Sequence, residues 1–354
     1  MQGLSKEREI FARGALVAKI LEGSWRGSPP ALALSRAALS EAAPLLLRTG
    51  AAGLGWWRVR LCELKDSEEA AQFREAYLLH TIQAVLHERE IDQALSLFRS
   101  FGVEPLLVKG WAVARLYPEP GLRPYGDVDL CVPPEQYPAA LSALESSDGE
   151  CNFVDLHKGS ANLDYADFDD VYARSRLVAM GDVSVRVPSP EDHLRILCMH
   201  LLRHGAWRHL WLCDVAAALE SRGPDFDWEV CLGSNSRRSD WVACAIGLAR
   251  ELLGARADDT PAADRAGSLP GWLLPTVLKQ WSVPYKFRVP VASYLRRPSG
   301  FLREIRHHWP NPIEATINMR GPFNGLPRFP FQVGDSLSRA AKFLRLVPKL
   351  MRNR

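Results

Sequence analysis

Two aspartates stand one residue apart in a stretch of sequence that otherwise has the composition of a protein interior. Asp127 and Asp129 alternate with Val128, Leu130 and Val132 in the segment GDVDLCV. Because residues i and i+2 of a strand project from the same face, both carboxylates are expected to lie side by side. Neighbouring carboxylates repel each other and stay ionised only when a cation neutralises them. The pair therefore indicates a divalent-cation site, and oxygen ligands on a strand suit Mg²⁺.

A second segment offers a third acid on the same kind of element. In CNFVDLH, Asp155 and His157 share one face of the expected strand, and Val154 and Leu156 share the other. Three acids on neighbouring strands can hold two divalent ions about 4 Å apart, which stabilise the entering and leaving oxygens of an in-line displacement. Asp155 fits a salt bridge or a sheet edge as well, so the residue pattern alone leaves its role open.

These residues need a small sheet to position them, and the surrounding sequence alternates between strand and helix patterns. Short apolar runs bounded by Gly and Pro predict strands, and runs with apolar residues every three or four positions predict helices. The strand–helix order predicts an α/β layer on one small mixed sheet. The predicted strands cover residues 103–110, 127–132, 151–157 and 183–188, with short helices at 111–117 and 134–147.

Helical patterns flank this core on both sides. An acidic first turn and recurring apolar residues predict a long helix over residues 67–100. The chain returns to a helical pattern at Ser189, where Asp192 three residues later is a capping arrangement. The acid-rich segment 163–175 is expected to be a solvated loop. We expect an α/β (α+β) fold with an N-terminal helical region (1–100), an α/β core (101–190) and a C-terminal helical domain with a basic tail (191–354).

Composition bounds the class of protein. The net charge of +3 over 354 residues is too small to indicate a nucleic-acid partner by itself. Seven scattered cysteines form no C-x-x-C pair, which argues against a disulfide framework or a zinc site and for a reducing, cytoplasmic location. The charged N-terminus lacks a signal-peptide core, and no apolar run approaches the roughly 20 residues that span a bilayer. We expect a soluble protein, at most peripheral to membranes.

A longer block of sequence carries a family resemblance. LLVKGWAVARLYPEPGLRPYGDVDLCV, followed by FVDLHK and PSPEDHLRILCMHLL, resembles the uncharacterised nucleotidyltransferase family of the DNA polymerase β-type superfamily. The resemblance covers roughly residues 75–220 and is most specific from the Lys-Gly turn to the Asp-x-Asp pair. It implies a nucleotidyltransferase core in which a glycine-containing turn precedes a D-x-D strand and a third acid. It also implies an NTP substrate and Mg²⁺ as cofactor.

The resemblance assigns roles to individual residues. It implies that Asp127 and Asp129 ligate Mg²⁺, and that Asp155 completes the site and takes the proton of an acceptor hydroxyl. Lys109 and Gly110 would lie at the nucleotide phosphates. The physical chemistry agrees, because a turn after a strand exposes backbone N–H groups to an anion and glycine permits close approach.

The turn departs from the superfamily pattern in two ways. Trp111 follows Gly110 where Gly-Ser or Gly-Gly is usual, and the gap between Gly110 and Asp127 is longer and admits the loop YPEPGLRPYG. This loop carries Arg123, which would balance charge on a leaving pyrophosphate. A loop arginine that pairs with an acid fits the sequence equally well.

The main hypothesis is Mg²⁺-dependent transfer of a nucleoside monophosphate from an NTP to a hydroxyl acceptor, with two metal ions. The alternative is a non-catalytic module of the same shape that binds a nucleotide or a partner. A third hypothesis is a metal-dependent phosphohydrolase built on a helix pair, and the spacing permits three of its histidines to share one helical face. The candidate residues are His193, His200, His204 and His209, with Asp214. Nucleic acid is not expected as the acceptor, since no basic groove with interleaved aromatic residues is evident.

The C-terminal segment 336–354 has a basic amphipathic pattern. No acid follows Asp335, and Leu337 and Leu344 lie opposite the basic residues. Such a segment suits an anionic membrane surface or an acidic partner, and also suits a helix that docks on its own protein. The sequence does not indicate the oligomeric state. The basic residues are Arg339, Lys342, Arg345, Lys349 and Arg352.

Overall fold

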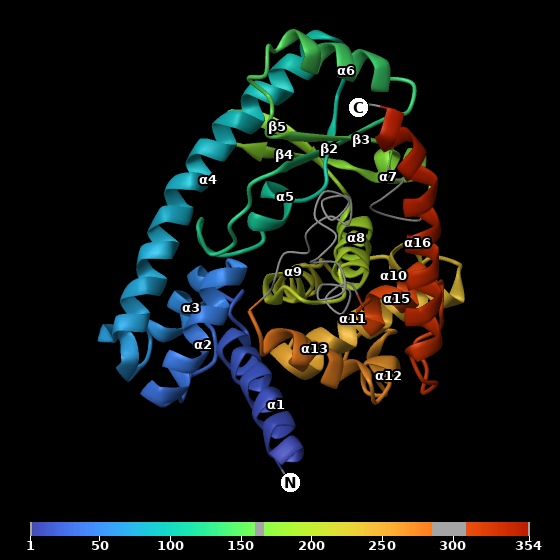
Figure 1. Cartoon of the computed structure of the whole chain (residues 1–354). Coiled ribbons are helices and arrows are strands. Elements are labelled where there is room, and N and C mark those ends of the chain that lie inside the picture. The colour runs from blue at the N-terminus through green and yellow to red at the C-terminus, as the bar shows by residue number, and fades with distance from the viewer. Residues whose placement is uncertain (1, 160–165, 285–308, 353–354) are drawn as a thin grey trace.

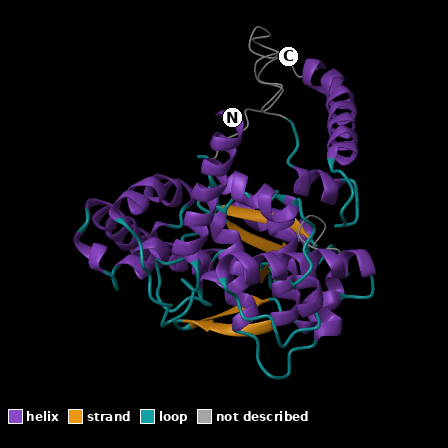
Figure 2. Cartoon of the chain, turned by 90° about the horizontal axis from the view of Figure 1, so that it is seen from below, coloured by secondary structure: helices purple, strands orange, loops and turns teal. Residues whose placement is uncertain are grey.

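The computed structural model describes residues 2–159, 166–284 and 309–352 (Figure 1). Helices flank one small five-stranded sheet, so the predicted α+β fold is confirmed. Figure 2 shows some strands among the helices and others at the edge of the molecule. The strands are β1 (Leu106–Leu107), β2 (Val128–Val132), β3 (Val154–Lys158), β4 (Arg176–Met180) and β5 (Val183–Val187). The helices before and within the sheet region are α1 (Gln2–Leu21), α2 (Arg36–Thr49), α3 (Ala52–Val59), the 3₁₀ helix η1 (Glu63–Asp66), α4 (Glu68–Ser100), α5 (Trp111–Ala114), α6 (Tyr137–Ser146) and α7 (Phe168–Arg174). Those that follow are α8 (Pro190–Arg203), α9 (His209–Glu220), α10 (Trp228–Leu232), α11 (Ser236–Leu253), α12 (Ala263–Ala266), α13 (Leu273–Trp281), α15 (Pro312–Asn318) and α16 (Phe329–Arg352).

The sheet is mixed, with strand order β3-β2-β1-β5-β4. Strands β2 and β3 are parallel, as are β1 and β5, whereas β1 with β2 and β4 with β5 are antiparallel. The predicted strands are confirmed, although β1 is only two residues long. Strand β4 was not predicted, because it lies at the sheet edge and buries only Met180 fully. Residues 163–165 of the predicted acidic loop lie outside the described residues, and the prediction is wrong from residue 168, where α7 begins after its N-cap Asp167.

The two faces of the sheet have different surroundings. Val128, Leu130 and Val132 of β2 pack in a hydrophobic cluster with Ile91 and Leu95 of α4 and with α6. Alternation along β2 therefore turns its polar residues to the opposite face. The expectation that the valine and leucine beside the aspartates point to the core is confirmed, and Asp129, the second residue of β2, faces the other way.

Helices from both ends of the chain share one core. Val17 of α1, Leu46 of α2, Val215 of α9 and Ile246 of α11 are fully buried members of a single hydrophobic cluster. Helices before and after the sheet region therefore pack together. The predicted division of the chain at residues 100 and 190 stays a prediction.

A sharp turn divides the helical stretch that follows the sheet. The predicted cap is confirmed, since the Ser189 hydroxyl accepts a hydrogen bond from the Asp192 amide at the start of α8. Gly205 and Ala206 both have positive φ, at 68° and 54°, a conformation that ends α8. The chain then reverses into α9, which brings Trp211 back against α8.

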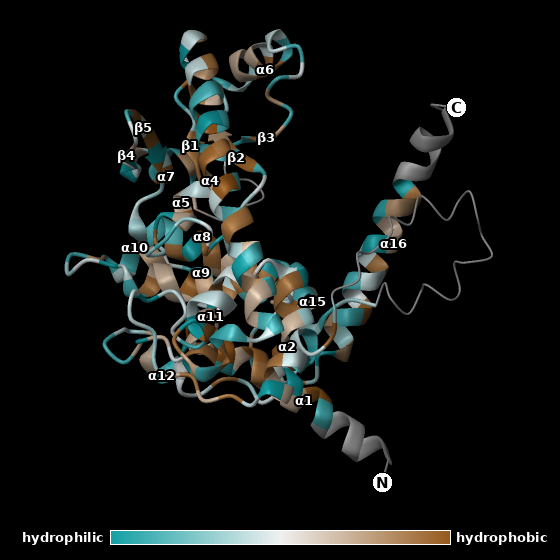
Figure 3. Cartoon of the chain, turned by 90° about the vertical axis from the view of Figure 1, so that its left-hand side faces the viewer, coloured by the Kyte–Doolittle hydropathy of each residue, from teal (hydrophilic) through white to brown (hydrophobic). Residues whose placement is uncertain are grey.

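Helix α16 confirms the predicted helical form of the basic segment as far as residue 352. Its first half contacts α15, and Figures 2 and 3 show its C-terminal half projecting away from the other helices. Leu337 and Leu344 are exposed on it, and Arg339 forms ion pairs with Glu314 and Asp335. Its contact with an acidic partner or an anionic membrane surface stays a prediction. Among the described residues, no helix combines the length and the apolar character needed to cross a membrane.

Candidate active site

Strands β2 and β3 place two acids directly side by side. Asp129 of β2 is the register partner of Asp155 of β3, and both strands run in the same direction. Register partners on neighbouring strands project from the same face, and His157 shares that face because it lies two residues beyond Asp155. In the part of the chain that the structure describes, these three residues form one group whose potential metal-ligand atoms all lie within 4.8 Å of one another.

Asp129 is the most tightly held member of this group. Its Oδ1 atom accepts a hydrogen bond from Lys109 Nζ at 2.6 Å and one from His157 Nε2 at 3.2 Å. His157 Nε2 also lies 3.3 Å from Asp155 Oδ2. Burial raises the pKa of the Asp129 carboxyl, but the His157 hydrogen bond and the Lys109 charge together outweigh it, so the net pKa is below its ordinary value. Asp129 is therefore a carboxylate at neutral pH.

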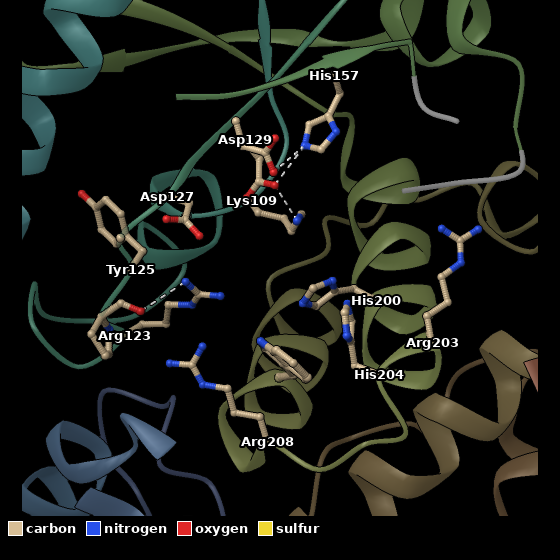
Figure 4. Close-up of a pocket in the computed structure, with 15 residues that line it drawn as sticks. Lys109, Arg123, Tyr125, Asp127, Asp129, His157, His200, Arg203, His204 and Arg208 are labelled. Carbon is tan, nitrogen blue, oxygen red and sulfur yellow. Dashed lines mark hydrogen bonds and ion pairs between the residues drawn. The ribbon is translucent and has the colours of Figure 1, made fainter. Parts of the chain in front are cut away.

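Asp127 lies one residue before β2, where it is exposed. Its carboxylate and that of Asp129 line the same pocket, as Figure 4 shows, although Asp127 is not in the close group. Asp155 also lines the pocket, and its side chain is 61% exposed. The predicted triad thus converges on one pocket, with one acid buried and two accessible.

The turn after β1 explains why the sequence has glycine and tryptophan in succession. Gly110 has φ of 62°, and a Cβ atom there would lie 3.4 Å from the backbone oxygen of Asp127. A side chain is disfavoured at positive φ, so glycine is needed where β1 turns toward the D-x-D segment. Trp111 is buried, and its Nε1 donates a hydrogen bond to Glu88 Oε1 of α4 at 3.1 Å. Trp111, which follows Gly110 where the superfamily usually has Ser or Gly, therefore anchors α5 to α4.

The inserted loop delivers Arg123 to the pocket in an ion pair. Arg123 Nε and Nη2 donate to Asp214 Oδ1 and Oδ2 at 3.1 and 2.7 Å, and both side chains are almost completely buried. The Tyr117 hydroxyl also donates to Asp214, at 2.8 Å. Arg123 lines the pocket as predicted, yet its charge is neutralised by an acid of α9. Its role at a pyrophosphate stays a prediction, and its structural role is to fasten the loop to α9.

Opposite the acids, α8 and α9 form a second wall. The His200 ring lies 4.6 Å from the Trp211 ring, and the His204 ring lies 5.0 Å from it, measured between centroids. Burial lowers the pKa of His200 well below its ordinary value and also lowers that of His204, and in both cases the nearby Lys109 charge adds to the effect. Both imidazoles are therefore neutral at pH 7. Arg208 Nε donates to the Thr49 carbonyl at 2.7 Å, and burial lowers the Arg208 pKa while the group stays charged.

A cavity of about 490 Å³ lies between the two walls (Figure 4). The acidic wall, here called the sheet wall, comes from the β1–α5 turn, β2 and β3, and the helix wall comes from α8 and α9. All six residues predicted from the sequence line this cavity: Lys109, Gly110, Arg123, Asp127, Asp129 and Asp155. Sequence reasoning missed the contributions of Tyr125, Arg203, Arg208 and Trp211 to the same pocket.

The histidines of the phosphohydrolase hypothesis do not converge. His200 and His204 line the cavity, whereas His193 is buried elsewhere on α8 and burial lowers its pKa to about 3. Asp214 is paired with Arg123 rather than with a histidine. The three histidines and this aspartate do not form a metal-ligand group within the described ranges.

Parallel strands of a mixed sheet thus present paired acids to a pocket whose opposite wall carries Arg203 and Arg208. A model of the uncharacterised nucleotidyltransferase family matches residues 48–158 and 147–254, which together span more than half of the chain. The chain belongs to this family, and the resemblance inferred from its sequence is confirmed. No curated protein and no solved structure gave a significant match. At this level the protein is a transferase with a nucleotide substrate.

Proposed function

We propose that the protein catalyses Mg²⁺-dependent transfer of a nucleoside monophosphate from an NTP to a hydroxyl acceptor, with release of pyrophosphate. The observation that carries this proposal is the in-register pair of Asp129 and Asp155 on parallel strands, with Asp127 lining the same pocket. Membership in a nucleotidyltransferase family supports it. The cavity of about 490 Å³ lies in the range that small-molecule sites occupy.

The acids fit a hard divalent cation. Asp129 and Asp155 bring carboxylate oxygens close together, and Asp127 adds a third carboxylate to the pocket. Mg²⁺ prefers oxygen ligands, whereas imidazole suits softer metals. We therefore assign these three aspartates as the residues that would hold two Mg²⁺ ions, with His157 as the hydrogen-bond partner that orients Asp129. Bound Mg²⁺ would neutralise charge that develops on the phosphoryl oxygens.

The transfer itself balances as an in-line displacement. The acceptor oxygen forms a bond to the α-phosphorus, the bond from that phosphorus to its bridging oxygen breaks, and the electron pair leaves with pyrophosphate. Asp155 has an exposed carboxylate at the pocket, where it accepts the proton of the acceptor hydroxyl. Lys109 lies beside Asp129 with its ammonium directed into the pocket, where it binds the phosphates.

The helix wall supplies further positive charge. Arg123 is neutralised by Asp214, so Arg208 is better placed to bind the triphosphate and the leaving pyrophosphate. Because His200 and His204 are neutral, they add no charge, and their rings pack against the Trp211 indole. This wall binds substrate, and the sheet wall carries out the chemistry.

The test is transfer of label from each α-labelled NTP in the presence of Mg²⁺ and a cell extract. The native protein is expected to label an acceptor and release pyrophosphate, and EDTA is expected to abolish both. The double variant Asp127→Asn/Asp129→Asn removes the charges at constant shape and is expected to be inactive. Label transfer that persists in the double variant contradicts the proposal.

The ion pair between Lys109 and Asp129 favours one second candidate. A carboxylate that is already neutralised by a lysine at 2.6 Å is compatible with a module that binds a nucleotide without turnover. The purified protein would then bind NTP, measured by calorimetry, and release no pyrophosphate with any acceptor fraction. Pyrophosphate release that depends on Asp129 excludes this candidate.

A further inference from the structure

The long helix α4 carries an exposed apolar stripe, and the Leu78 end of this stripe borders a groove that is also lined by Trp56 and Leu61. Five large apolar residues of this stripe are between 49 and 61% exposed. They recur at intervals of three and four residues, which places them on one face of the helix. Single exposed leucines are ordinary, but a contiguous apolar stripe two turns long marks an interaction surface. The stripe consists of Leu78, Leu79, Ile82, Val85 and Leu86.

The opposite side of α4 is already occupied. Phe73, Ile91 and Phe98 are fully buried, and the Ala84 carbonyl accepts a hydrogen bond from the Tyr125 hydroxyl. Helix α4 is therefore fixed in its orientation, and the exposed stripe cannot turn inward. Figure 1 shows α4 along one outer edge of the molecule, and Figure 3 views that edge, with hydrophobic segments along the helix.

Charged residues bracket the stripe in a pattern that is its own complement. Glu75 lies seven residues before Ile82, and Arg89 lies seven residues after it. Because seven residues are close to two helical turns, Glu75 and Arg89 share the face of Ile82, at positions of a heptad repeat.

This symmetry selects the partner. When two copies of α4 pack antiparallel about Ile82, Glu75 of one copy meets Arg89 of the other. The apolar residues match in the same register, because Leu78 lies four positions before Ile82 and Leu86 lies four positions after it. A parallel arrangement would instead set Glu75 against Glu75 and Arg89 against Arg89, which repel. The mixed charges also make the stripe a poor match for an anionic membrane surface.

We infer that α4 is the interface of a two-fold symmetric homodimer, in which two copies of the chain pack antiparallel across Ile82. Such an interface is isologous, because the same patch serves on both subunits and each ion pair occurs twice. The inference is independent of the proposed chemistry, since the stripe lies on the face of α4 opposite the pocket.

Sedimentation velocity of the full chain between about 1 and about 100 µM tests the inference. The native protein is expected to show a concentration-dependent dimer. Ile82→Glu sets two like charges on the two-fold axis and is expected to give a monomer. Leu177→Glu, at an exposed leucine of β4, is the matched control and leaves the dimer intact. A native protein that stays monomeric at the highest concentration overturns the inference, as does a dimer that survives Ile82→Glu.

A charge exchange tests the register separately. Glu75→Arg or Arg89→Glu alone places like charges at both symmetry-related contacts and is expected to raise the dimer dissociation constant about tenfold. The double variant Glu75→Arg/Arg89→Glu restores both pairs and is expected to recover the native constant. These residues are exposed, so circular dichroism is expected to show unchanged helix content in all variants. Failure of the double variant to recover dimerisation overturns the antiparallel register.

Discussion

The two walls of the pocket hold their charged groups in opposite ways. On the sheet wall, Asp155 is 61% exposed and Asp129 is held by Lys109, a flexible side chain that lines the same pocket. At the helix wall, Arg123 of the inserted loop and Asp214 of α9 form a buried bidentate pair, and partial burial together with the nearby Lys109 charge lowers the pKa of His200 and of His204. Charge on the sheet wall can therefore be exchanged with a ligand, whereas charge behind the helix wall is part of the structure. We expect catalysis to depend on the first wall, and stability and substrate affinity to depend on the second.

The sharpest test of this contrast compares one substitution from each wall. Asp129→Asn keeps the shape of the side chain and removes its charge, so we expect kcat to fall about 10³-fold or more. His200→Gln removes a neutral ring on the helix wall, and we expect kcat to change by less than about tenfold. The measurement is steady-state pyrophosphate release with whichever NTP labels an acceptor.

The reverse outcome would break the comparison. A phosphohydrolase centred on α8 predicts that His200→Gln abolishes activity and that Asp129→Asn spares it. Urea unfolding of both variants serves as the control, because a variant that has lost its fold also loses activity without any catalytic cause.

The next largest expected effect comes from the buried ion pair between Arg123 and Asp214, and it concerns the free energy of unfolding rather than the reaction rate. Asp214→Asn leaves the Arg123 guanidinium buried without a counter-ion, and we expect the free energy of unfolding to fall by about 3 to 5 kcal/mol. The double variant Arg123→Met/Asp214→Leu replaces both partners with apolar groups of similar volume and is expected to lose clearly less. The measurement is urea denaturation at pH 7. A single variant as stable as the native protein would mean that the pair is not structural.

The sequence predicts the sheet wall more completely than the helix wall. The three acids Asp127, Asp129 and Asp155 can be predicted from the sequence because a strand has a period of two, so residue spacing alone determines which side chains share a face. Gly110 can be predicted because a turn that follows a strand often needs positive φ, which glycine adopts at low cost. The register that pairs Asp129 with Asp155 is not encoded by either strand alone, and neither is the length of β1.

The helix wall depends on contacts between distant segments. Arg208 and Trp211 reach the pocket only because Gly205 and Ala206 reverse the chain after α8. A glycine inside a helical pattern hints at such a break, but it does not indicate the angle between the two helices. Asp214 is likewise 91 residues from its partner Arg123, and no local pattern predicts that pair. The shared core of the N-terminal and C-terminal helices is non-local in the same sense.

The neutral histidines behind the helix wall predict a loss of stability in acid. Burial lowers the pKa of His209 to about 3, below the roughly 6.5 of an unfolded chain. Above pH 6.5 neither state binds the proton. As pH falls from 6.5 toward 3 the unfolded state binds it and the folded state does not, so the free energy of unfolding decreases.

For this one group the decrease between pH 7 and pH 5 is about 2 kcal/mol. His209→Gln is expected to reduce the difference between the native unfolding free energies at pH 7 and pH 5 by that amount, and His193→Gln is expected to act similarly because its pKa is also about 3. The measurement is urea denaturation at both pH values. If the difference in unfolding free energy between pH 7 and pH 5 is unchanged in both variants, these histidines have the same pKa in the folded and unfolded states. The folded protein would then carry more charge near the helix wall in acid than we assign to it.

The smallest effect concerns Arg208 and separates binding from chemistry. Arg208 faces the acids across the cavity, and its guanidinium also fastens the start of α9 to the Thr49 carbonyl. If the helix wall only binds substrate, Arg208→Gln raises KM for the NTP about tenfold and leaves kcat within about twofold, because it removes an interaction that ground state and transition state share. Arg208→Lys keeps the charge but not the planar fork and is expected to lie between Arg208→Gln and the native protein. The KM of the native protein should also rise with ionic strength more steeply than that of Arg208→Gln, since salt screens only a charge that is present. A fall in kcat at unchanged KM would instead place Arg208 in contact with charge that develops during the reaction. The helix wall would then take part in the chemistry, and the division of labour between the two walls would be wrong.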